Sequence, residues 1–391
     1  MDPRLNPYAP GAGTPPPELA GRDQIIEKAA IALDRMRHGR ATRSVIFYGL
    51  RGVGKTVLLT EIKLGAMERG IIPVIIEAPE DRSLPSVLIP ALRSALLRVS
   101  RKEAVKAKMS SALRALGSFA KAFKVKYSDV EFSVDMASEA GVADSGDLEG
   151  DLTDLLMAVG EAAKEADTAV VLFIDELQYI PEEQLAALIS ALHRTSQSQL
   201  PITLVAAGLP QLVGQTGRAK SYAERLFEFV PVDKLEPPAA KDALCKPAER
   251  EGVSFTPEAV AEILKQTQGY PYFLQEWGKH VWDIAETSPI DEAVAKAATE
   301  SALSELDQSF FRVCLDRLTP TEKLYLRAMA ELGPGPHRSG DIADKLHKIV
   351  SAVAPVRNKL IAKGMIYSPS HGDTAFTVPL FDGYMRRTMA F

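Results

Sequence analysis

Residues 44–56 read SVIFYGLRGVGKT, and this stretch decides the fold. Its first five residues, Ser44–Tyr48, are rich in β-branched and aromatic side chains, which predicts a short buried strand. Gly49–Thr56 satisfies the pattern G-x-x-x-x-G-K-[ST], in which a glycine-rich turn lets successive backbone N–H groups face phosphate oxygens. A helical pattern over 56–67 follows, and its positive dipole end points at the same place. The stretch therefore predicts a phosphate-binding loop between a strand and a helix.

A second apolar run, Ala169–Ile174, ends in Asp175 and Glu176. Acids at the end of a strand can simply cap the next helix. In combination with the glycine loop, however, they suit a nucleotide site, because ligands of open α/β sheets lie beyond the carboxyl ends of the strands. Asp175 is then expected to hold a magnesium shell, and Glu176 to orient or deprotonate an attacking water.

The predicted cofactors are ATP and Mg²⁺. Lys55 supplies a point charge to the β- and γ-phosphates, and the Thr56 hydroxyl is the second expected magnesium ligand beside Asp175. Nucleotide contacts from the loop and the start of its helix are predicted at Gly49, Arg51, Gly52, Val53, Gly54, Lys55, Thr56 and Val57.

Apolar strands alternate with helical patterns through the first part of the chain, which predicts an α/β fold with a parallel sheet. The patterns are a helix over 22–38, strands over 71–77 and 202–206, and a helix over 182–197. This α/β domain is expected to span 21–235. Pro237-Pro238 then marks a boundary, and 236–303 reads as a helical lid, with helices starting at Thr256-Pro257 and Ser288-Pro289.

Composition places the chain among ordinary globular proteins. The 391 residues, of which 46% are hydrophobic and 25% charged, suit two or three domains. Two cysteines predict neither a disulfide framework nor a zinc site, and the net charge of −5 argues against a surface coated with basic charge. No apolar run reaches the length of a membrane span, and residues 1–20 lack the apolar core of a signal peptide and favour an extended arm. We therefore expect a cytoplasmic protein without a membrane partner.

A charged insertion is expected at about 98–167, between the second and third strands. Residues 98–126 hold nine basic side chains and one acid, whereas 127–167 hold twelve acids and one base. Alternation over Val125–Val134 suggests a small hairpin, and 138–150 resemble a flexible linker. Such an element could meet nucleic acid or an acidic partner. The alternative is a solvated amphipathic helix neutralised by its own acidic flank, which is the more common meaning of a charge run.

The last segment, 304–391, has the pattern of a winged helix. Short helices are expected over 339–346 and 350–363, with Pro355 near a start or kink, and a hairpin follows around the polar turn PSHGD. In such a domain the second helix lies in the major groove of DNA and a wing touches the backbone. Docking of a protein is the alternative use. The DNA contacts predicted are Ser351, Arg357, Asn358, Lys359 and Lys363, with His371 on the wing.

Together, these motifs resemble the AAA+ P-loop ATPases of the branch that includes origin-recognition initiators, archaeal ATPases and STAND signalling NTPases. The residues that carry the resemblance are the Gly21-Arg22 entry helix, GLRGVGKT, VVLFIDELQ, AAGLPQL at 206–212, YAERLFEF at 222–229 and TQGYPYFLQ at 267–275.

The resemblance implies three further site residues. Arg22 belongs to the segment that lies over the adenine, Pro271 to the lid motif beside the nucleotide, and Arg225 to an arginine-bearing segment that contacts the γ-phosphate within its own chain or from a neighbour. A surface arginine paired with nearby acids is the alternative for Arg225. A contact from a neighbour would imply a nucleotide-dependent homo-oligomer.

Two positions depart from the family pattern. Ala206, Ala207 and Gly208 stand where many AAA+ proteins have a polar sensor, and Tyr272 stands in place of the arginine of the lid motif. We therefore expect slow ATP hydrolysis, suited to a switch.

Two functions follow from these features. The first is a nucleotide-dependent switch that hydrolyses ATP slowly and binds double-stranded DNA through the winged helix. The alternative is a STAND-like signalling ATPase that docks a protein partner without binding DNA.

Overall fold

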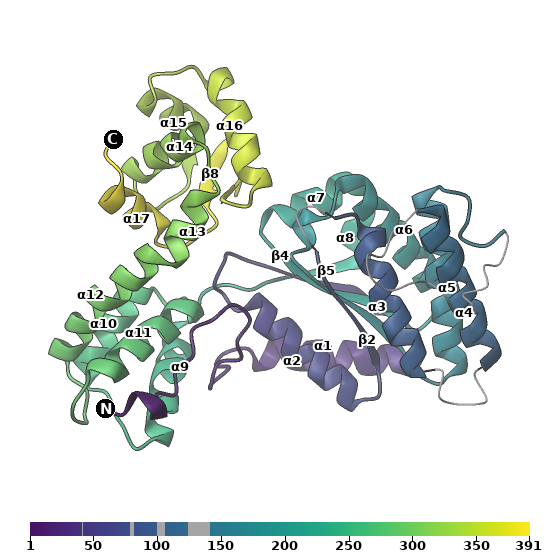
Figure 1. Ribbon diagram of the computed structural model, residues 1–391, viewed down its shortest axis with the longest axis horizontal. Helices are drawn as coiled ribbons and strands as arrows, with labels where there is room; N and C mark the ends of the chain where they lie inside the picture. The colour runs from purple at the N-terminus through teal and green to yellow at the C-terminus, as the bar shows by residue number, and fades with distance from the viewer. Residues whose placement is uncertain (41, 79–81, 100–105, 124–140) are drawn as a thin grey trace.

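The computed structural model describes residues 1–391 except 41, 79–81, 100–105 and 124–140. Its elements form an α/β domain, a helical lid and a C-terminal domain joined to the lid by one helix (Figure 1). No helix in this described part of the chain is long and apolar enough to cross a bilayer.

A five-stranded parallel sheet forms the centre of the first domain, in the order β2-β3-β4-β1-β5. The strands are β1 (Ser44–Tyr48), β2 (Ile72–Glu77), β3 (Val170–Asp175), β4 (Ile202–Gly208) and β5 (Phe227–Pro231). The first four strands along the chain, β1 to β4, match the sequence prediction within one or two residues. β5 was not predicted, because Glu228 interrupts its apolar pattern and it pairs with a single neighbour, β1.

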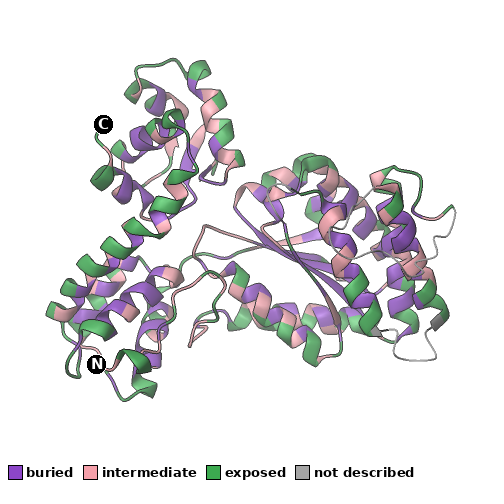
Figure 2. Ribbon diagram, viewed as in Figure 1, coloured by how far each residue is buried: buried purple, intermediate pink, exposed green. Residues whose placement is uncertain are grey.

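Helices cover both faces of this sheet, as its apolar strands require (Figure 2). One face packs on α1 (Asp23–Arg37) and α2 (Lys55–Glu68), with Val45, Phe47 and Phe173 in the interface. The alternate strand residues, such as Ile46 and Ile174, pack into the other cluster. The helices on that side are α3 (Leu84–Val99), α4 (Lys106–Ala122), α5 (Leu148–Glu165), α6 (Glu182–Gln197), α7 (Gln211–Ala219) and α8 (Ala223–Leu226).

The described residues of the charged insertion include α4 and α5, which pack against each other through an apolar interface that includes Leu116 and Phe119. Lys108 on α4 pairs with Glu161 on α5 at 2.9 Å, as expected for a basic helix neutralised by its acidic flank. The predicted linker differs: Asp151 accepts hydrogen bonds from the backbone of Ser145 and Gly146, and α5 already begins at Leu148. The predicted hairpin at 125–134 lies outside the described residues.

Four helices form the lid: α9 (Pro237–Arg250), α10 (Pro257–Thr267), α11 (Pro271–Ile284) and α12 (Glu292–Gln308). Thr256 caps α10 as predicted. The predicted start at Ser288-Pro289 is wrong: Ile290 is extended and bridges to Phe255, so α12 begins only after Asp291, whose side chain caps it. Because α12 continues to Gln308, it crosses the expected boundary at 303/304.

The N-terminal arm lies along this lid. A short 3₁₀ turn, η1 (Pro3–Leu5), is followed by irregular chain. Asn6 donates to the Lys279 carbonyl (3.0 Å), and the buried Tyr8 donates its hydroxyl to the Leu244 carbonyl. The arm therefore packs on the lid through Asn6 and Tyr8, and its composition alone did not predict these contacts.

The C-terminal domain has the order expected of a winged helix, with a three-stranded antiparallel sheet β6-β8-β7. The predicted helix over 350–363 is present, but Pro355 lies inside it, in its second turn. The elements are α13 (Phe310–Asp316), α14 (Pro320–Glu331), β6 (His337–Arg338), α15 (Ser339–Lys345), α16 (Val350–Ala362), β7 (Ile366–Tyr367), β8 (Asp373–Phe376) and α17 (Phe381–Thr388).

Candidate nucleotide-binding site

The glycine loop runs from the end of β1 into α2 and has the conformation that phosphate binding needs. Gly52 (φ 77°) and Gly54 (φ 89°) adopt left-handed backbone angles that favour glycine. Val53 between them is fully buried, which anchors the loop against the sheet. The N–H groups at the amino end of α2 are thereby presented to a cavity of about 280 Å³.

Lys55 is buried and folds back on the loop. Its Nζ donates to the carbonyls of Gly49 (3.1 Å) and Leu50 (2.8 Å). Burial lowers the pKa of Lys55 to about 8, against the opposing effect of Glu176 and Asp175. The two carbonyls and the nearby acids thus compensate only weakly for the hydration that the ammonium has lost. The negative charge of a bound phosphate would complete this compensation.

The structure brings the two halves of the predicted site together. Thr56 Oγ1 donates to Asp175 Oδ2 at 2.6 Å, which links the first turn of α2 to the end of β3. Burial raises the pKa of the Asp175 carboxyl above its ordinary value. A hydroxyl and a carboxylate at this distance fit the oxygen ligands that Mg²⁺ takes in nucleotide sites, so Thr56 and Asp175 would hold it.

Glu176 follows Asp175 in a left-handed backbone conformation (φ 53°), which is costly for a residue with a side chain. Its carboxylate accepts a hydrogen bond from Gln178 Nε2 and lies on the wall of the nucleotide cavity. The turn therefore directs Glu176 toward the space next to the phosphate loop.

Gln178, in the 3₁₀ turn η3 (Leu177–Tyr179), is a site residue that sequence reasoning missed. Its Oε1 accepts from the Leu209 N–H (3.0 Å), just beyond β4, while its amide donates to Glu176. A Cβ on Gly208 would lie 2.5 Å from this oxygen, so the glycine makes room for it. A polar side chain thus reaches the end of β4, where Ala206–Gly208 offer none.

The lid closes one side of the cavity through Pro271 and Tyr272 at the start of α11. The Tyr272 N–H donates to the Gly52 carbonyl (3.1 Å), so the lid contacts the phosphate loop directly. Residues 9–14 of the N-terminal arm form another wall, and a Cβ on Gly13 would lie 3.1 Å from the Thr56 methyl group. This contact of the arm was not predicted, because it joins residues more than 40 positions apart.

Arg22 lines the cavity, but its guanidinium is directed to the backbone. It donates to the carbonyls of Val53 (3.2 Å) and Asp233, and burial lowers the pKa of Arg22. Arg22 therefore supports the phosphate loop from behind. Val57, also predicted as a nucleotide contact, lies on the cavity wall.

Arg225 lies elsewhere. It is exposed on α8 and is not among the residues that line the cavity. β5 starts just after it and pairs with β1 from Ser44 onward, so Arg225 is at the amino end of the strands, whereas the phosphate loop is at their carboxyl end. The structure does not bring Arg225 to the site of its own chain. A contact from a neighbouring chain remains a prediction.

The C-terminal domain touches the phosphate loop. The Arg51 N–H donates to the Thr377 carbonyl (2.9 Å), and Arg51 Nη2 donates to Tyr179 Oη (3.0 Å). A Cβ on Gly364, at the end of α16, would meet Leu209, Arg51 and Tyr179 within 3.2 Å. The loops that follow β1, β3 and β4 are therefore all in contact with the winged helix.

Between α16 and the α/β domain lies a cleft of about 1460 Å³. Arg357, Asn358 and Lys363 form one wall, and Gln178, Arg218 and Lys234 are among the residues opposite. The helix predicted to contact DNA thus faces the ATP-site domain across this cleft.

Two of the five residues predicted to contact DNA are engaged within their own domain. Arg357 donates to Thr374 Oγ1 (2.9 Å), Ser368 Oγ (2.9 Å) and the Asp373 carbonyl (3.0 Å), and so joins α16 to the wing. Lys363 pairs with the buried Glu322 at 2.8 Å. The other three, Ser351, Asn358 and Lys359, are exposed on α16, as is His371 on the wing.

A strand, a phosphate loop, a helix and a strand that ends in Asp-Glu, on a sheet of this order, define a P-loop ATPase site. Comparison with known proteins agrees: residues 18–205 match the family model described as AAA ATPase domain. The matched segment is just under half of the chain, and the predicted AAA+ resemblance is confirmed. Residues 308–385 match a second model, Domain of unknown function (DUF8462).

Relatives share the architecture at low sequence identity. A Walker-type ATPase of Pyrococcus abyssi is 18% identical with a TM-score of 0.60, and the match covers 98% of this chain and 99% of that one. The Aeropyrum pernix ORC1 protein, solved in complex with DNA, is 16% identical with a TM-score of 0.48, covering 95% and 93%. An uncharacterized HTH-type transcriptional regulator of Methanocaldococcus jannaschii is 25% identical in the matched region. The match covers 57% of this chain and 56% of that protein.

Proposed function

We propose that this protein is an ATP-dependent switch that hydrolyses ATP slowly and uses its nucleotide state to control how the winged helix binds double-stranded DNA. The observation that carries the proposal is the hydrogen bond from the Arg51 N–H, inside the phosphate loop, to the Thr377 carbonyl of the C-terminal domain. Arg51 lies in the loop whose N–H groups and Lys55 would take the phosphates, so nucleotide occupancy can act on this contact.

Nucleotide binding rests on the phosphate loop. Bound Mg²⁺ would neutralise phosphate charge, with Thr56 and Asp175 as its protein ligands. Lys55 would exchange its two carbonyl contacts for phosphate oxygens, a charge-assisted and therefore stronger interaction. Glu176 would orient the attacking water and accept its proton.

Slow turnover follows from the way in which Glu176 is held. Its carboxylate is hydrogen-bonded to Gln178, and Gln178 is bonded in turn to the backbone after β4. In this arrangement the Gln178 amide occupies Glu176 Oε2, so this oxygen is not free to accept a proton from water. Retention of bound ATP suits a switch more than a motor.

The DNA-binding part of the proposal rests on α16. Ser351, Asn358 and Lys359 are exposed there, and Asn and Lys can contact base edges and phosphates. The relative from Methanocaldococcus jannaschii is named as an HTH-type transcriptional regulator, which agrees with such a role.

Fluorescence anisotropy of a labelled duplex tests the proposal, measured with ATP, with ADP and without nucleotide at two salt concentrations. We expect ATP and ADP to give different affinities, and binding to weaken at the higher salt concentration. Lys359→Ala should lower the affinity. It should also reduce the slope of the logarithm of the binding constant against the logarithm of the salt concentration by about one, the value of a single phosphate contact. Negligible binding that is insensitive to salt in all three nucleotide states would overturn the DNA part.

One observation favours the alternative of a docked protein partner. Ile349 and Val350, at the start of α16, are 72% and 49% exposed, and apolar side chains there suit a protein surface better than phosphates. If duplex DNA does not bind but an Ile349→Asp variant loses a protein that co-purifies with the wild type, the winged helix is a docking element. Phosphate release that needs Glu176 but ignores DNA would agree with this outcome.

A further inference from the structure

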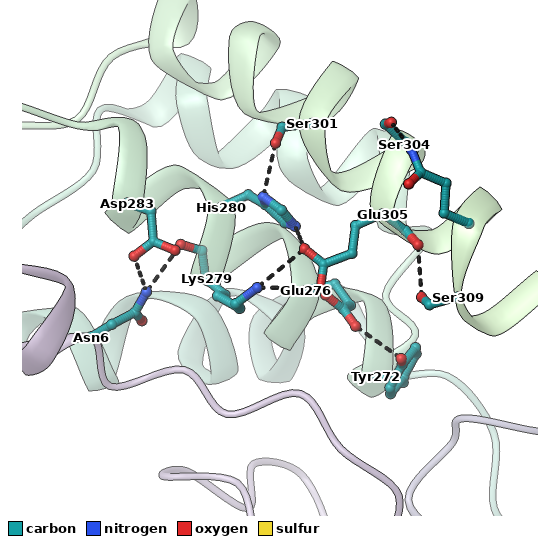
Figure 3. A network of polar contacts seen from close by, with 11 residues as sticks. Asn6, Tyr272, Glu276, Lys279, His280, Asp283, Ser301, Ser304, Glu305 and Ser309 are labelled. Carbon is teal, nitrogen blue, oxygen red and sulfur yellow. Dashed lines mark hydrogen bonds and ion pairs between the residues drawn. The ribbon is translucent and has the colours of Figure 1, made fainter.

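Three side chains of the lid converge on one point away from the nucleotide cavity. Glu276 and His280 are one turn apart on α11, and Glu305 faces them from α12 (Figure 3). Their ligand atoms, one from each residue, all lie within 4.8 Å of one another. Two carboxylates and an imidazole on two packed helices therefore share a small space.

Two of these groups are deeply buried and lack hydrogen bonds at the atoms that face this space. Glu276 is 5% exposed and His280 is 8% exposed. Among the described residues, Glu276 Oε2 and His280 Nε2 have no hydrogen-bond partner. His280 Nε2 is 3.1 Å from Glu305 Oε2, in ion-pair range but without hydrogen-bond geometry. Buried polar atoms left in this way are costly, so a ligand that satisfies them would stabilise the lid.

The remaining atoms of the two buried side chains are held by neighbours. His280 Nδ1 is 3.1 Å from Ser301 Oγ, and Tyr272 Oη donates to Glu276 Oε1 (2.8 Å). When Nδ1 donates to Ser301, the lone pair of the neutral imidazole is on Nε2 and points to the carboxylates. Metal-binding histidines and carboxylates are usually oriented by hydrogen bonds of this kind.

We propose that Glu276, His280 and Glu305 bind a divalent transition-metal ion such as Zn²⁺. Imidazole nitrogen and carboxylate oxygen are ligands that Zn²⁺ accepts together, with water in the remaining position. Two ligands of a tetrahedral zinc ion lie roughly 3.4 Å apart, close to the 3.1 Å between His280 Nε2 and Glu305 Oε2. Magnesium and calcium prefer oxygen ligands alone and fit this set less well.

Lys279 is the competing cation. Its Nζ lies 3.2 Å from Glu305 Oε2, and its side chain is 31% exposed. A metal ion at the three ligands would repel the ammonium, which can turn to solvent because its flexible stem reaches the surface.

The metal would act on the nucleotide site through Tyr272. It would fix Glu276, whose second oxygen holds the Tyr272 hydroxyl, and the Tyr272 N–H is bonded to the Gly52 carbonyl in the phosphate loop. The proposed ion therefore holds α11 to α12 and stiffens the part of the lid that touches the P-loop.

The test is a Zn²⁺ titration of the full nucleotide-free chain against a chelating dye, together with thermal melts. We expect one ion per chain and a melting temperature that rises with Zn²⁺. His280→Gln and Glu276→Gln should each weaken binding at least tenfold, and Ser301→Ala about 10- to 100-fold. His371→Gln, an exposed histidine on the wing, and Cys314→Ser are the controls and should bind as the wild type does.

Lys279→Met separates a metal site from a simple ion-pair network, even if a ligand variant folds poorly. Removal of the competing ammonium should tighten Zn²⁺ binding, whereas a network held by Lys279 would only lose thermal stability. Absence of stoichiometric binding, or equal affinity in the wild type and His280→Gln, would overturn the proposal. Because DNA and ATP are not used, failure here leaves the proposed function intact.

Discussion

At the scale of single residues, the nucleotide site combines strong burial with few compensating partners. Lys55 is buried against backbone carbonyls, Glu176 has a left-handed backbone, and Asp175 is held by the Thr56 hydroxyl. The burial of the Lys55 ammonium and the backbone conformation of Glu176 cost stability in the free protein, and a bound phosphate would compensate the buried charge of Lys55.

Lys55 makes ATP binding depend on pH. Its pKa of about 8 is below the ordinary lysine value, so the free protein loses this charge as the pH rises through 8, whereas a bound phosphate needs it charged. ATP affinity, measured by calorimetry, should therefore fall roughly 30-fold between pH 7 and 9.5. Lys55→Arg keeps its charge over this range, so any affinity that it retains should not vary with pH there. An equal slope in both proteins would contradict this role of Lys55.

The sign of the same shift predicts an effect on stability. Folding lowers the pKa of Lys55, so the unfolded chain binds more protons between about pH 8 and the ordinary lysine pKa. The contribution of Lys55 to the free energy of unfolding should then rise with pH across that window. Denaturant melts of the free wild type and Lys55→Met at pH 7.5 and 9.5 measure it, and Lys55→Met should lack this contribution.

Gln178 is a positioning residue for Glu176. Gln178→Leu removes its hydrogen bonds to the Glu176 carboxylate and the Leu209 N–H, so the carboxylate is released to accept a proton from water. We expect kcat for ATP hydrolysis to rise about tenfold, a free-energy difference of roughly 1.4 kcal/mol, with little change in KM for ATP. Glu176→Gln, the matched control, should abolish turnover and retain binding. A change in KM with kcat unaltered would mean that Gln178 acts on binding instead.

At the scale of elements, the N-terminal arm is part of the lid and of the nucleotide cavity. Tyr8 is buried among the lid helices, and a Cβ on Gly278 would overlap its ring at 2.5 Å. Glycine in α11 weakens the helix but admits the aromatic ring. The anchored arm then passes residues 9–14 across the cavity.

Tyr8→Ala should therefore loosen the arm. Loss of the buried ring is expected to destabilise the lid by about 3 kcal/mol and to weaken ATP binding, because residues 9–14 lose their anchor. Tyr8→Phe keeps the ring and loses the bond to the Leu244 carbonyl, so its cost should be about 1 kcal/mol. Denaturant unfolding and ATP titration check both variants. Unaltered ATP affinity in Tyr8→Ala would show that the arm is no part of the binding site.

At the scale of the whole molecule, the winged helix contacts the loops after β1, β3 and β4 and places α16 across a cleft from the ATPase domain. The contact would couple the nucleotide site to the proposed DNA-binding helix. If ATP changes the affinity for DNA, DNA must change the affinity for ATP by the same factor.

The hydroxyl of Tyr179 offers a test of this coupling. It accepts a hydrogen bond from Arg51 Nη2, so Tyr179→Phe removes one link between the loops that face the winged helix. We expect the effect of ATP on DNA affinity to shrink by about 1 kcal/mol, roughly fivefold, while ATP binding without DNA stays close to the wild type. Anisotropy titrations with and without ATP measure it, and an unchanged factor would place the coupling elsewhere.

Local pattern was sufficient for the α/β domain and for the core of its site. The strand at 44–48, the glycine loop, Lys55, Thr56 and the pair Asp175-Glu176 lie close to where the sequence predicted them, because strand burial and loop chemistry are encoded by neighbouring residues. Short edge elements such as β5, and the start of α12, depend on pairing with distant segments and were missed or misplaced.

By itself, the sequence determined the class of fold, the phosphate loop and its two acids, and a C-terminal winged helix. The tertiary structure alone decided the roles of side chains whose partners are far away in the chain. It assigned Gln178 to the Leu209 N–H, Arg357 and Lys363 to internal bonds, Tyr8 to the lid, and Arg51 to Thr377. The physical reason is that hydrogen bonds and burial depend on which segments pack together, and residue spacing along the chain carries no record of partners tens or hundreds of positions apart.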